Sequence, residues 1–239
     1  MGIISIKDVT KKYKTKTALD SVSLEINTGE LFGLLGVNGA GKTTLIKILC
    51  GLTKKTSGTV FINNLNLDDS IDKIKEIVDV SPQETSIANN LTVKENLDFF
   101  AAIYGKQNSH VISEVVKVFK LTDVLNQRAK TLSGGYKRRL SIAVALISEP
   151  QILFLDEPTL GLDVLARREL WQIISKLKNK ITIILTSHYL EEIEHLCDRV
   201  AILSEGKLLE VGTIEELKQK ADAKTFEDAF VSFVEKNNE

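Results

Sequence analysis

The chain combines segments that alternate apolar and polar side chains with segments that are apolar throughout. Residues 4–9 and 19–26 alternate, as strands of a half-buried antiparallel sheet do. Residues 31–35 form a nearly all-apolar run that leads into a glycine, a pattern typical of a strand buried on both faces. Three more buried strands are predicted at residues 152–155, 181–185 and 200–203.

Helical periodicity separates the later buried runs. Residues 164–178 and 190–197 place apolar side chains three and four positions apart, which is the spacing of one helix face. Buried strands that alternate with helices predict an α/β fold with a parallel sheet. The tail from Lys207 adds a short strand and an amphipathic helix at residues 214–220, and the last three residues, 237–239, are expected to fray.

The pattern changes between about residues 83 and 149. Residues 93–104 and 111–119 have helical periodicity, and no buried strand interrupts them. We therefore expect one domain over residues 1–239 that contains an inserted helical subdomain. Its core would comprise residues 1–82 and 150–239, and the helical subdomain residues 83–149.

Composition and charge describe an ordinary folded protein. The 239 residues are 43% hydrophobic and 26% charged, and a net charge of −1 offers no general attraction for nucleic acid. No apolar run approaches the about 20 residues that cross a membrane, and the N-terminus lacks a signal-peptide core. We expect a cytoplasmic protein in which Cys50 and Cys197 are buried thiols.

A glycine-rich segment predicts a site for phosphate groups. Residues 36–43 match the pattern G-x-x-x-x-G-K-[ST] in full, between a buried strand and a helix at residues 44–50. Glycines let backbone N–H groups surround a phosphate, and the helix N-terminus adds a positive partial charge. Lys42 supplies a cation for the β- and γ-phosphates, and the Thr43 hydroxyl suits Mg²⁺. The predicted nucleotide-binding residues are Gly36, Val37, Asn38, Gly39, Ala40, Gly41, Lys42, Thr43 and Thr44.

Two acids follow the buried run at residues 152–155. Asp156 and Glu157 are expected at the carboxyl edge of the sheet, where ligands of open α/β folds bind. Asp156 is placed to hold Mg²⁺, and Glu157 to orient an attacking water and accept its proton. Kinases and GTPases share the phosphate loop, but a GTPase would need a base-reading Asn-Lys-x-Asp segment, which is missing. Asp-Glu-Pro could instead simply end a strand. This alternative is less favoured because residues 36–43 predict a phosphate site in the same chain.

Residues 132–136, Leu-Ser-Gly-Gly-Tyr, open a helix predicted for residues 137–147. Ser133 is a suitable cap, and the two glycines allow close backbone approach to a ligand. The predicted helix begins with Lys-Arg-Arg at residues 137–139, although cations there oppose the helix dipole by roughly 0.3–1 kcal/mol each. The conflict indicates a compensating anion or a functional site, unless the three side chains simply point into solvent.

Together these motifs resemble the nucleotide-binding subunits of ABC transporters, and the resemblance covers nearly the whole chain. It implies a P-loop NTPase with a RecA-like parallel core, an N-terminal antiparallel β subdomain and an inserted helical subdomain. It also implies ATP hydrolysis with Mg²⁺ as cofactor. The motifs occur in family order at residues 36–43, Gln83, 132–135, 152–157, 161–163 and His188.

The resemblance gives roles to residues that mean little alone. Gln83 resembles a glutamine that contacts Mg²⁺ and the attacking water and links ATP to a membrane partner. His188 resembles a switch histidine that contacts the γ-phosphate, whereas His110 and His195 are interpreted as structural. Tyr13 stands where the family has an adenine-stacking aromatic ring, with a packing role as the alternative.

The same resemblance implies a head-to-tail dimer with two ATP molecules between the subunits. Ser133, Gly134 and Gly135 inherit a contact with the γ-phosphate of ATP on the other subunit, and Asp163 resembles a residue that bridges the two sites. The expected partners are a second copy or a related ATPase subunit, and an integral-membrane permease that docks near residues 83–97 on the inner face of the cell membrane. No nucleic acid is expected.

The chain departs from the family pattern at Tyr136, Leu160 and Val164, where other residues are commoner. None of these departures removes a phosphate, metal or water contact, so they bear on the subfamily and not on ATP hydrolysis. Residues 137–143 and 187–199 look most like those of bacterial multidrug, antibiotic or polysaccharide exporters, so we expect an ATPase that drives export. Two alternatives stay open: an ABC ATPase acting on DNA, the ribosome or the cell wall, and a nucleotide-gated module that moves no solute. The chain has a single cassette of nearly neutral charge, which favours transport over action on DNA or the ribosome.

Overall fold

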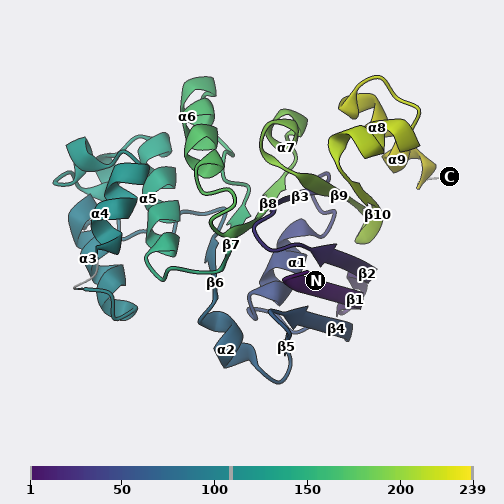
Figure 1. Cartoon of the computed structure of the whole chain (residues 1–239), viewed down its shortest axis with the longest axis horizontal. Coiled ribbons are helices and arrows are strands. Elements are labelled where there is room, and N and C mark those ends of the chain that lie inside the picture. Colours follow the sequence, from purple (N-terminus) through teal and green to yellow (C-terminus); the bar gives the residue numbers. More distant parts are fainter. Residues whose placement is uncertain (1, 108–109, 238–239) are drawn as a thin grey trace.

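Two β-sheets organise the chain in the computed structural model, which describes residues 2–107 and 110–237 (Figure 1). The N-terminal strands form an antiparallel sheet, and the later strands form a mostly parallel one. The strands are β1 (Ile4–Tyr13), β2 (Lys16–Ile26), β3 (Leu31–Leu35), β4 (Ser57–Ile62), β5 (Leu65–Asn66), β6 (Val78–Ser81), β7 (Ile152–Asp156), β8 (Thr182–Ser187), β9 (Arg199–Ser204) and β10 (Lys207–Gly212).

The strand order confirms the predicted α/β class. The antiparallel sheet runs β2-β1-β4-β5, and the larger sheet runs β10-β9-β3-β8-β7-β6. Within the larger sheet every neighbouring pair is parallel except β9 with β10. The ends of β3, β7 and β8 therefore meet at one edge of the sheet, which is where ligands of such folds bind.

Nine α-helices and two short 3-10 helices appear in the described part of the chain. Figure 1 shows α3, α4 and α5 gathered at one end of the molecule, away from the antiparallel sheet. The nine α-helices are α1 (Lys42–Leu49), α2 (Ile71–Lys75), α3 (Val93–Ile103), α4 (Val111–Val118), α5 (Gly134–Leu146), α6 (Val164–Ser175), α7 (Leu190–Leu196), α8 (Ile214–Lys220) and α9 (Phe226–Lys236). None of the described residues between 83 and 149 lies in one of the ten strands.

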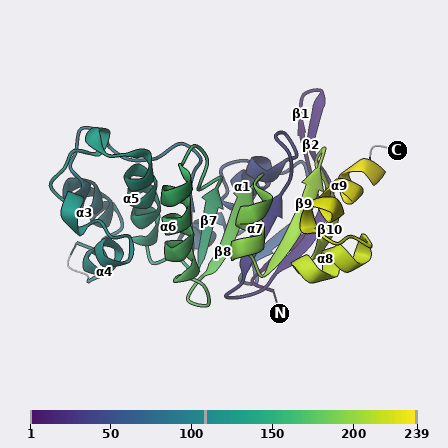
Figure 2. The same cartoon turned by 90° about the horizontal axis from the view of Figure 1, so that it is seen from above.

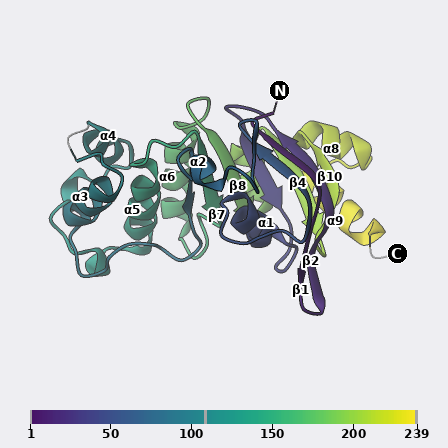
Figure 3. The same ribbon diagram turned by 90° about the horizontal axis from the view of Figure 1, so that it is seen from below.

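Separate apolar clusters pack on the two faces of the parallel sheet. Along β7, Leu153 and Leu155 join one cluster, while Ile152 and Phe154 join the other. Since successive side chains of a strand point to opposite faces, this division explains why the predicted buried strands are apolar throughout. Figure 2 shows α6 and α7 over one face, and Figure 3 shows α1 and the antiparallel sheet over the other.

The structure corrects the start of one predicted helix and adds a helix that the sequence did not predict. Helix α5 begins at Gly134 rather than residue 137, so Lys137, Arg138 and Arg139 come after its first three residues. Beyond the helix predicted at residues 214–220, α9 forms an additional helix whose Phe226 is buried. Of the residues expected to fray, Asn237 directly follows the last residue of α9, whereas 238 and 239 lie outside the described residues.

Two further expectations concern the cysteines and the membrane. Cys50 is a buried free thiol and Cys197 a partly buried one, and burial raises the pKa of both thiols. No helix among the described residues is both long enough and apolar enough to cross a membrane.

Candidate nucleotide site

The glycine-rich loop is tightly built at the end of β3. A Cβ on Gly36 would lie only 2.3 Å from the carbonyl oxygen of Leu203, so this position requires glycine. Gly41, the residue before α1, has a φ of 106°, which L side chains rarely adopt. These two positions explain why the loop needs glycine and how it turns directly into the first residue of the helix.

A cavity of about 520 Å³ lies against this loop. It brings together side chains from the β1–β2 hairpin, the loop, the segment after β6 and the ends of β7 and β8. Lys16, Ala18 and Leu160 line it as well, although the sequence analysis did not single them out as ligand contacts. The predicted site residues that line it are Tyr13, Asn38, Gly39, Ala40, Gly41, Lys42, Thr43, Thr44, Gln83, Glu157 and His188.

The Glu157 carboxylate lies between two basic side chains. Its Oε1 is 3.3 Å from Lys42 Nζ, and its Oε2 is 2.8 Å from His188 Nδ1. Lys42 Nζ also donates to the Gly36 carbonyl at 2.6 Å and to the Val37 carbonyl at 3.4 Å. The Lys42 and Glu157 side chains are only 6% and 8% exposed, and a buried carboxylate is tolerated where it is paired. The cavity thus presents a cation, a carboxylate and a histidine within a few ångströms.

Thr186 connects the two acids at the end of β7, Asp156 and Glu157. Its hydroxyl donates to Asp156 Oδ1 at 2.6 Å and accepts from the Glu157 backbone N–H at 2.9 Å. The sequence analysis missed this residue; its signal was a polar side chain at the end of an apolar strand, two positions before His188. Thr186 is fully buried, so it fixes both acids from the neighbouring strand.

The residues near Asp156 suit a nucleotide-bound Mg²⁺. Thr43 Oγ1 donates to Asp156 Oδ1 at 3.2 Å, which places two hard oxygen ligands side by side at the loop. No group of three or more His, Cys, Asp and Glu residues able to hold a metal occurs in the described part of the chain. Mg²⁺ at such sites takes most of its ligands from phosphates and water, so a hydroxyl, a carboxylate and the nearby Gln83 fit its requirements.

Arg138 fixes the segment that carries Gln83. Its guanidinium donates to the Pro82 carbonyl at 2.7 Å and also to the Gln83 carbonyl. Burial lowers the pKa of Arg138, while Asp156 and Glu192 oppose that shift. Arg139 pairs with the Glu169 carboxylate. Of the three cations near the start of α5, Arg138 is therefore compensated by carbonyl oxygens and Arg139 by a carboxylate.

Helix α7, which follows His188, is held against α6 by a buried acid. Trp171 Nε1 donates to Glu192 Oε1 at 3.1 Å. Burial raises the pKa of Glu192 despite hydrogen bonds from neighbouring side chains that lower it. His195 stacks on the Trp171 ring with centroids 5.0 Å apart, and the exposed His110 lies 3.4 Å from Glu114. Neither of these two histidines lines the cavity.

Gly36, Val37 and Asp156 lie at the site without lining the cavity, whereas four other predicted site residues lie elsewhere in the single chain. Ser133 caps α5, with its hydroxyl accepting from the Tyr136 N–H at 3.4 Å. Asp163 caps α6 by accepting from the N–H groups of the second and third helix residues at 2.9 Å. Ser133, Gly134, Gly135 and Asp163 do not line the cavity of their own chain.

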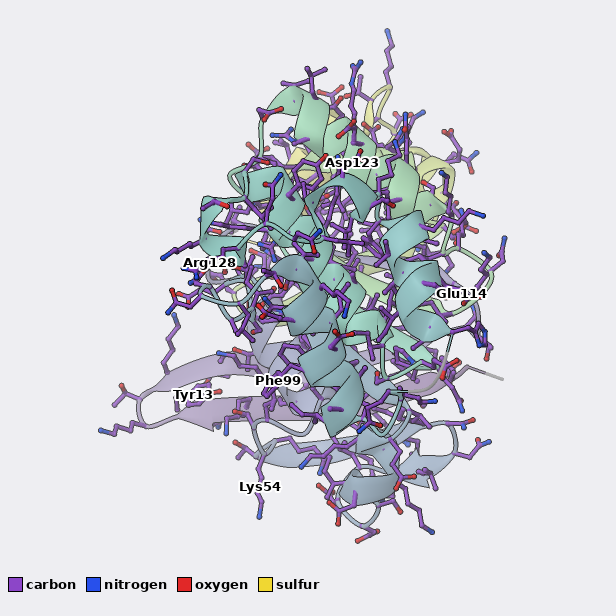
Figure 4. All side chains as sticks on the ribbon, turned by 90° about the vertical axis from the view of Figure 1, so that its left-hand side faces the viewer. Tyr13, Lys54, Phe99, Glu114, Asp123 and Arg128 are labelled. Carbon is purple, nitrogen blue, oxygen red and sulfur yellow. The ribbon has the colours of Figure 1, made fainter. Side chains whose placement is uncertain are left out.

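Tyr13 lies on a hairpin that projects beside the cavity (Figure 4). Its side chain is 45% exposed, and the Lys11 ammonium stands 4.6 Å from its ring centroid. An exposed ring at the rim of a cavity offers a stacking surface.

Comparisons with known proteins identify the class to which this fold and site belong. The family model described as "ABC transporter" matches residues 19–160. The Escherichia coli protein "Probable multidrug ABC transporter ATP-binding protein YbhF" is 39% identical over 97% of this chain, which spans 42% of that protein. The Bacillus subtilis protein "Linearmycin resistance ATP-binding protein LnrL" is 35% identical over 96% of this chain and 75% of its own length.

A solved structure supports the same class. The dimeric post-hydrolysis state of the ATP-binding cassette MJ0796, bound to ADP and Pi, superposes with a TM-score of 0.78 at 27% identity, covering 88% of this chain and 98% of that one. The fold is that of an ATP-binding cassette. The chain belongs to the ABC transporter family.

Proposed function

We propose that two copies of this chain bind and hydrolyse ATP between them and thereby power export of a solute through a separate membrane-spanning permease. The position of the Glu157 carboxylate, between Lys42 and His188 in the cavity, carries the proposal. The names of YbhF and LnrL refer to multidrug transport and linearmycin resistance, which supports export over the other work that the same ATPase could perform.

Hydrolysis needs a base that accepts a proton from the attacking water. Glu157 is close to the phosphate loop through Lys42, and a carboxylate so placed can orient the water and accept its proton. Lys42 would bind the β- and γ-phosphates, and His188, hydrogen-bonded to Glu157 at 2.8 Å, would contact the γ-phosphate. Thr43, Asp156 and Gln83 would hold Mg²⁺, which when bound would offset the negative charge of the phosphates.

The dimer would supply what one chain lacks. Ser133, Gly134 and Gly135 do not line the cavity of their own chain, which suits a contact with ATP held by a second copy. Asp163, next to the exposed Val164 and Leu165 at the start of α6, would lie at the junction between the copies. The relative MJ0796 is a dimer in its post-hydrolysis structure.

The Gln83 segment would pass the nucleotide state to the permease. Gln83 lines the cavity, and its carbonyl accepts a hydrogen bond from Arg138 of α5. A movement of Gln83 when the phosphates bind or leave would therefore displace the helices of residues 83–149. We assign these residues to a helical subdomain that docks the permease near residues 83–97. The position would be peripheral, at the inner face of the cell membrane.

Co-purification tests the export part of the proposal. An affinity-tagged chain expressed in its own host should retain a multi-span membrane protein in roughly equal amounts, and the ATPase activity of the pair should exceed that of the subunit alone. Retention of a ribosome, a nucleic acid or only soluble proteins would contradict export and favour a non-transport ATPase.

A further inference from the structure

The β1–β2 hairpin concentrates positive charge beside the nucleotide site. Residues 9–19 contain four lysines and no acidic residue, although the whole chain has a net charge of −1. We call this segment the lysine hairpin. Figures 2 and 3 show β1 and β2 extending beyond the body of the molecule. Its lysines are Lys11, Lys12, Lys14 and Lys16.

The contacts of the lysine hairpin direct it toward the cavity. Tyr13 pairs with Lys16 at the tip of the hairpin, and both residues line the cavity. Lys11 is held over the Tyr13 ring, because its ammonium also donates to the Lys54 carbonyl at 2.6 Å. Positive charge therefore lies next to the Tyr13 ring at the rim of the cavity.

Little in the structure neutralises this charge. The exposed Lys12, Lys14 and Lys16 form no ion pair with any residue in the described ranges 2–107 and 110–237. Among the described residues that line the cavity, Glu157 is the one acid, and it is paired with Lys42. The lysine hairpin therefore presents unpaired cations beside a cavity whose one lining acid is already paired.

We propose that the lysine hairpin captures the polyphosphate of ATP from solution and guides the nucleotide into the cavity. The proposal rests on ATP being the ligand of this site, as proposed above. Charges within about 8–10 Å of a ligand act on it at moderate salt, and such fields raise association rates by roughly 10–10³-fold. Charges at the rim change mainly the association rate and its salt dependence, so Lys12 and Lys14 would speed capture without taking part in hydrolysis.

The test compares two double variants with the same change of charge. Lys12→Gln/Lys14→Gln removes two cations from the hairpin. Lys117→Gln/Lys120→Gln removes two exposed cations from and just beyond α4, at the opposite end of the molecule (Figure 1). The control matches in backbone as well, because Lys14 and Lys120 have φ values of 47° and 53°.

Stopped-flow mixing with a fluorescent N-methylanthraniloyl derivative of ATP measures association at several salt concentrations. For Lys12→Gln/Lys14→Gln we expect the association rate constant to fall roughly 3–10-fold at low salt and to approach the wild-type value as salt screens the charges. The dissociation rate constant and the ATPase kcat should stay unchanged. The α4 variant should associate like the wild type at every salt concentration.

An association rate constant for Lys12→Gln/Lys14→Gln equal to the wild-type value at low salt would overturn the proposal, as would an equal fall in the α4 variant. If association is unchanged but sedimentation with phosphatidylglycerol vesicles is lost, the lysines serve an anionic membrane surface and the proposal is wrong. Failure of the wild-type chain to bind the nucleotide would instead refute the ATP site itself, so the two failures are distinguishable.

Discussion

At the scale of single residues, the Glu157 carboxylate depends on a small set of constraints. Its backbone has a φ of 48°, in the left-handed region, which costs roughly 1–3 kcal/mol outside glycine. The Thr186 hydroxyl holds its N–H, while Lys42 and His188 hold its carboxylate. These partners offset the cost of the turn and of burial, and they fix the carboxylate toward the phosphate loop.

Thr186→Val tests this support. Valine has nearly the same shape but leaves the buried Glu157 N–H without a partner, which costs about 1–3 kcal/mol of unfolding free energy. It also frees Asp156 from its 2.6 Å hydrogen bond. Because residues that orient ligands typically contribute 10–100-fold to activity, we expect ATP turnover to fall roughly 10–100-fold. Urea unfolding and steady-state ATPase assays measure the two effects.

Thr182→Val is the matched control on the same strand. Its buried hydroxyl accepts from the Gly29 N–H at 2.9 Å, and Thr182 does not line the nucleotide cavity. This variant should lose comparable stability and keep its turnover. Equal turnover in the Thr186 and Thr182 variants would contradict the positioning role of Thr186.

Residue chemistry alone predicts part of the site. Residues 36–43 and the acids 156–157 can be placed from sequence because each motif sets its own local geometry beside an apolar strand. Thr186 and Lys16 could not be found this way. Their importance depends on which strands are neighbours, namely β8 beside β7 and a hairpin tip beside the loop, and single-sequence patterns leave that order open.

At the scale of elements, helix starts were predicted best where a cap and apolar spacing coincide. Helix α3 begins at Val93 and α6 at Val164, as predicted, because caps and apolar spacing agree there. The start of α5 was predicted three residues late, since Gly-Gly has low helix propensity and only packing on α6, where Gly135 approaches Ala166, explains a helix there. Short β6, with its polar alternate residues, gave too weak a signal to be singled out.

The Asp163 cap provides a test at this scale. Its carboxylate accepts from the N–H groups of Leu165 and Ala166, both at 2.9 Å. Asp163→Ala should lower the unfolding free energy by about 1 kcal/mol, and Asp163→Ser, another good cap, should recover most of it. If the residue also bridges the two sites of a dimer, the serine variant will regain stability but not turnover. Urea unfolding of an alanine variant as stable as the wild type would contradict the cap.

At the scale of the whole molecule, one chain holds a cavity but only part of the proposed site. The sheet order brings the ends of β3, β7 and β8 together, and with them Lys42, Glu157 and His188. The caps at Ser133 and Asp163 start two adjacent helices outside this cavity. This arrangement supports our proposal that ATP is hydrolysed only when two copies close on the nucleotide.

Substitution of Glu157 by glutamine separates closure from hydrolysis. Glu157→Gln keeps the size of the side chain but removes the base, so ATP should still bind and hold two copies together. Adding Ser133→Arg to this variant should prevent the ATP-dependent dimer, and Lys42→Ala should weaken nucleotide binding itself. Gel filtration with ATP and Mg²⁺ measures the dimer.

The most direct measurement is the ATP turnover of Glu157→Gln beside that of the wild-type chain. A lost general base lowers turnover by about 10²–10⁴-fold, and we expect a fall in that range in a variant that still binds ATP and dimerises. Turnover close to the wild-type value would contradict the assignment of Glu157 as the base and, with it, the proposed mechanism.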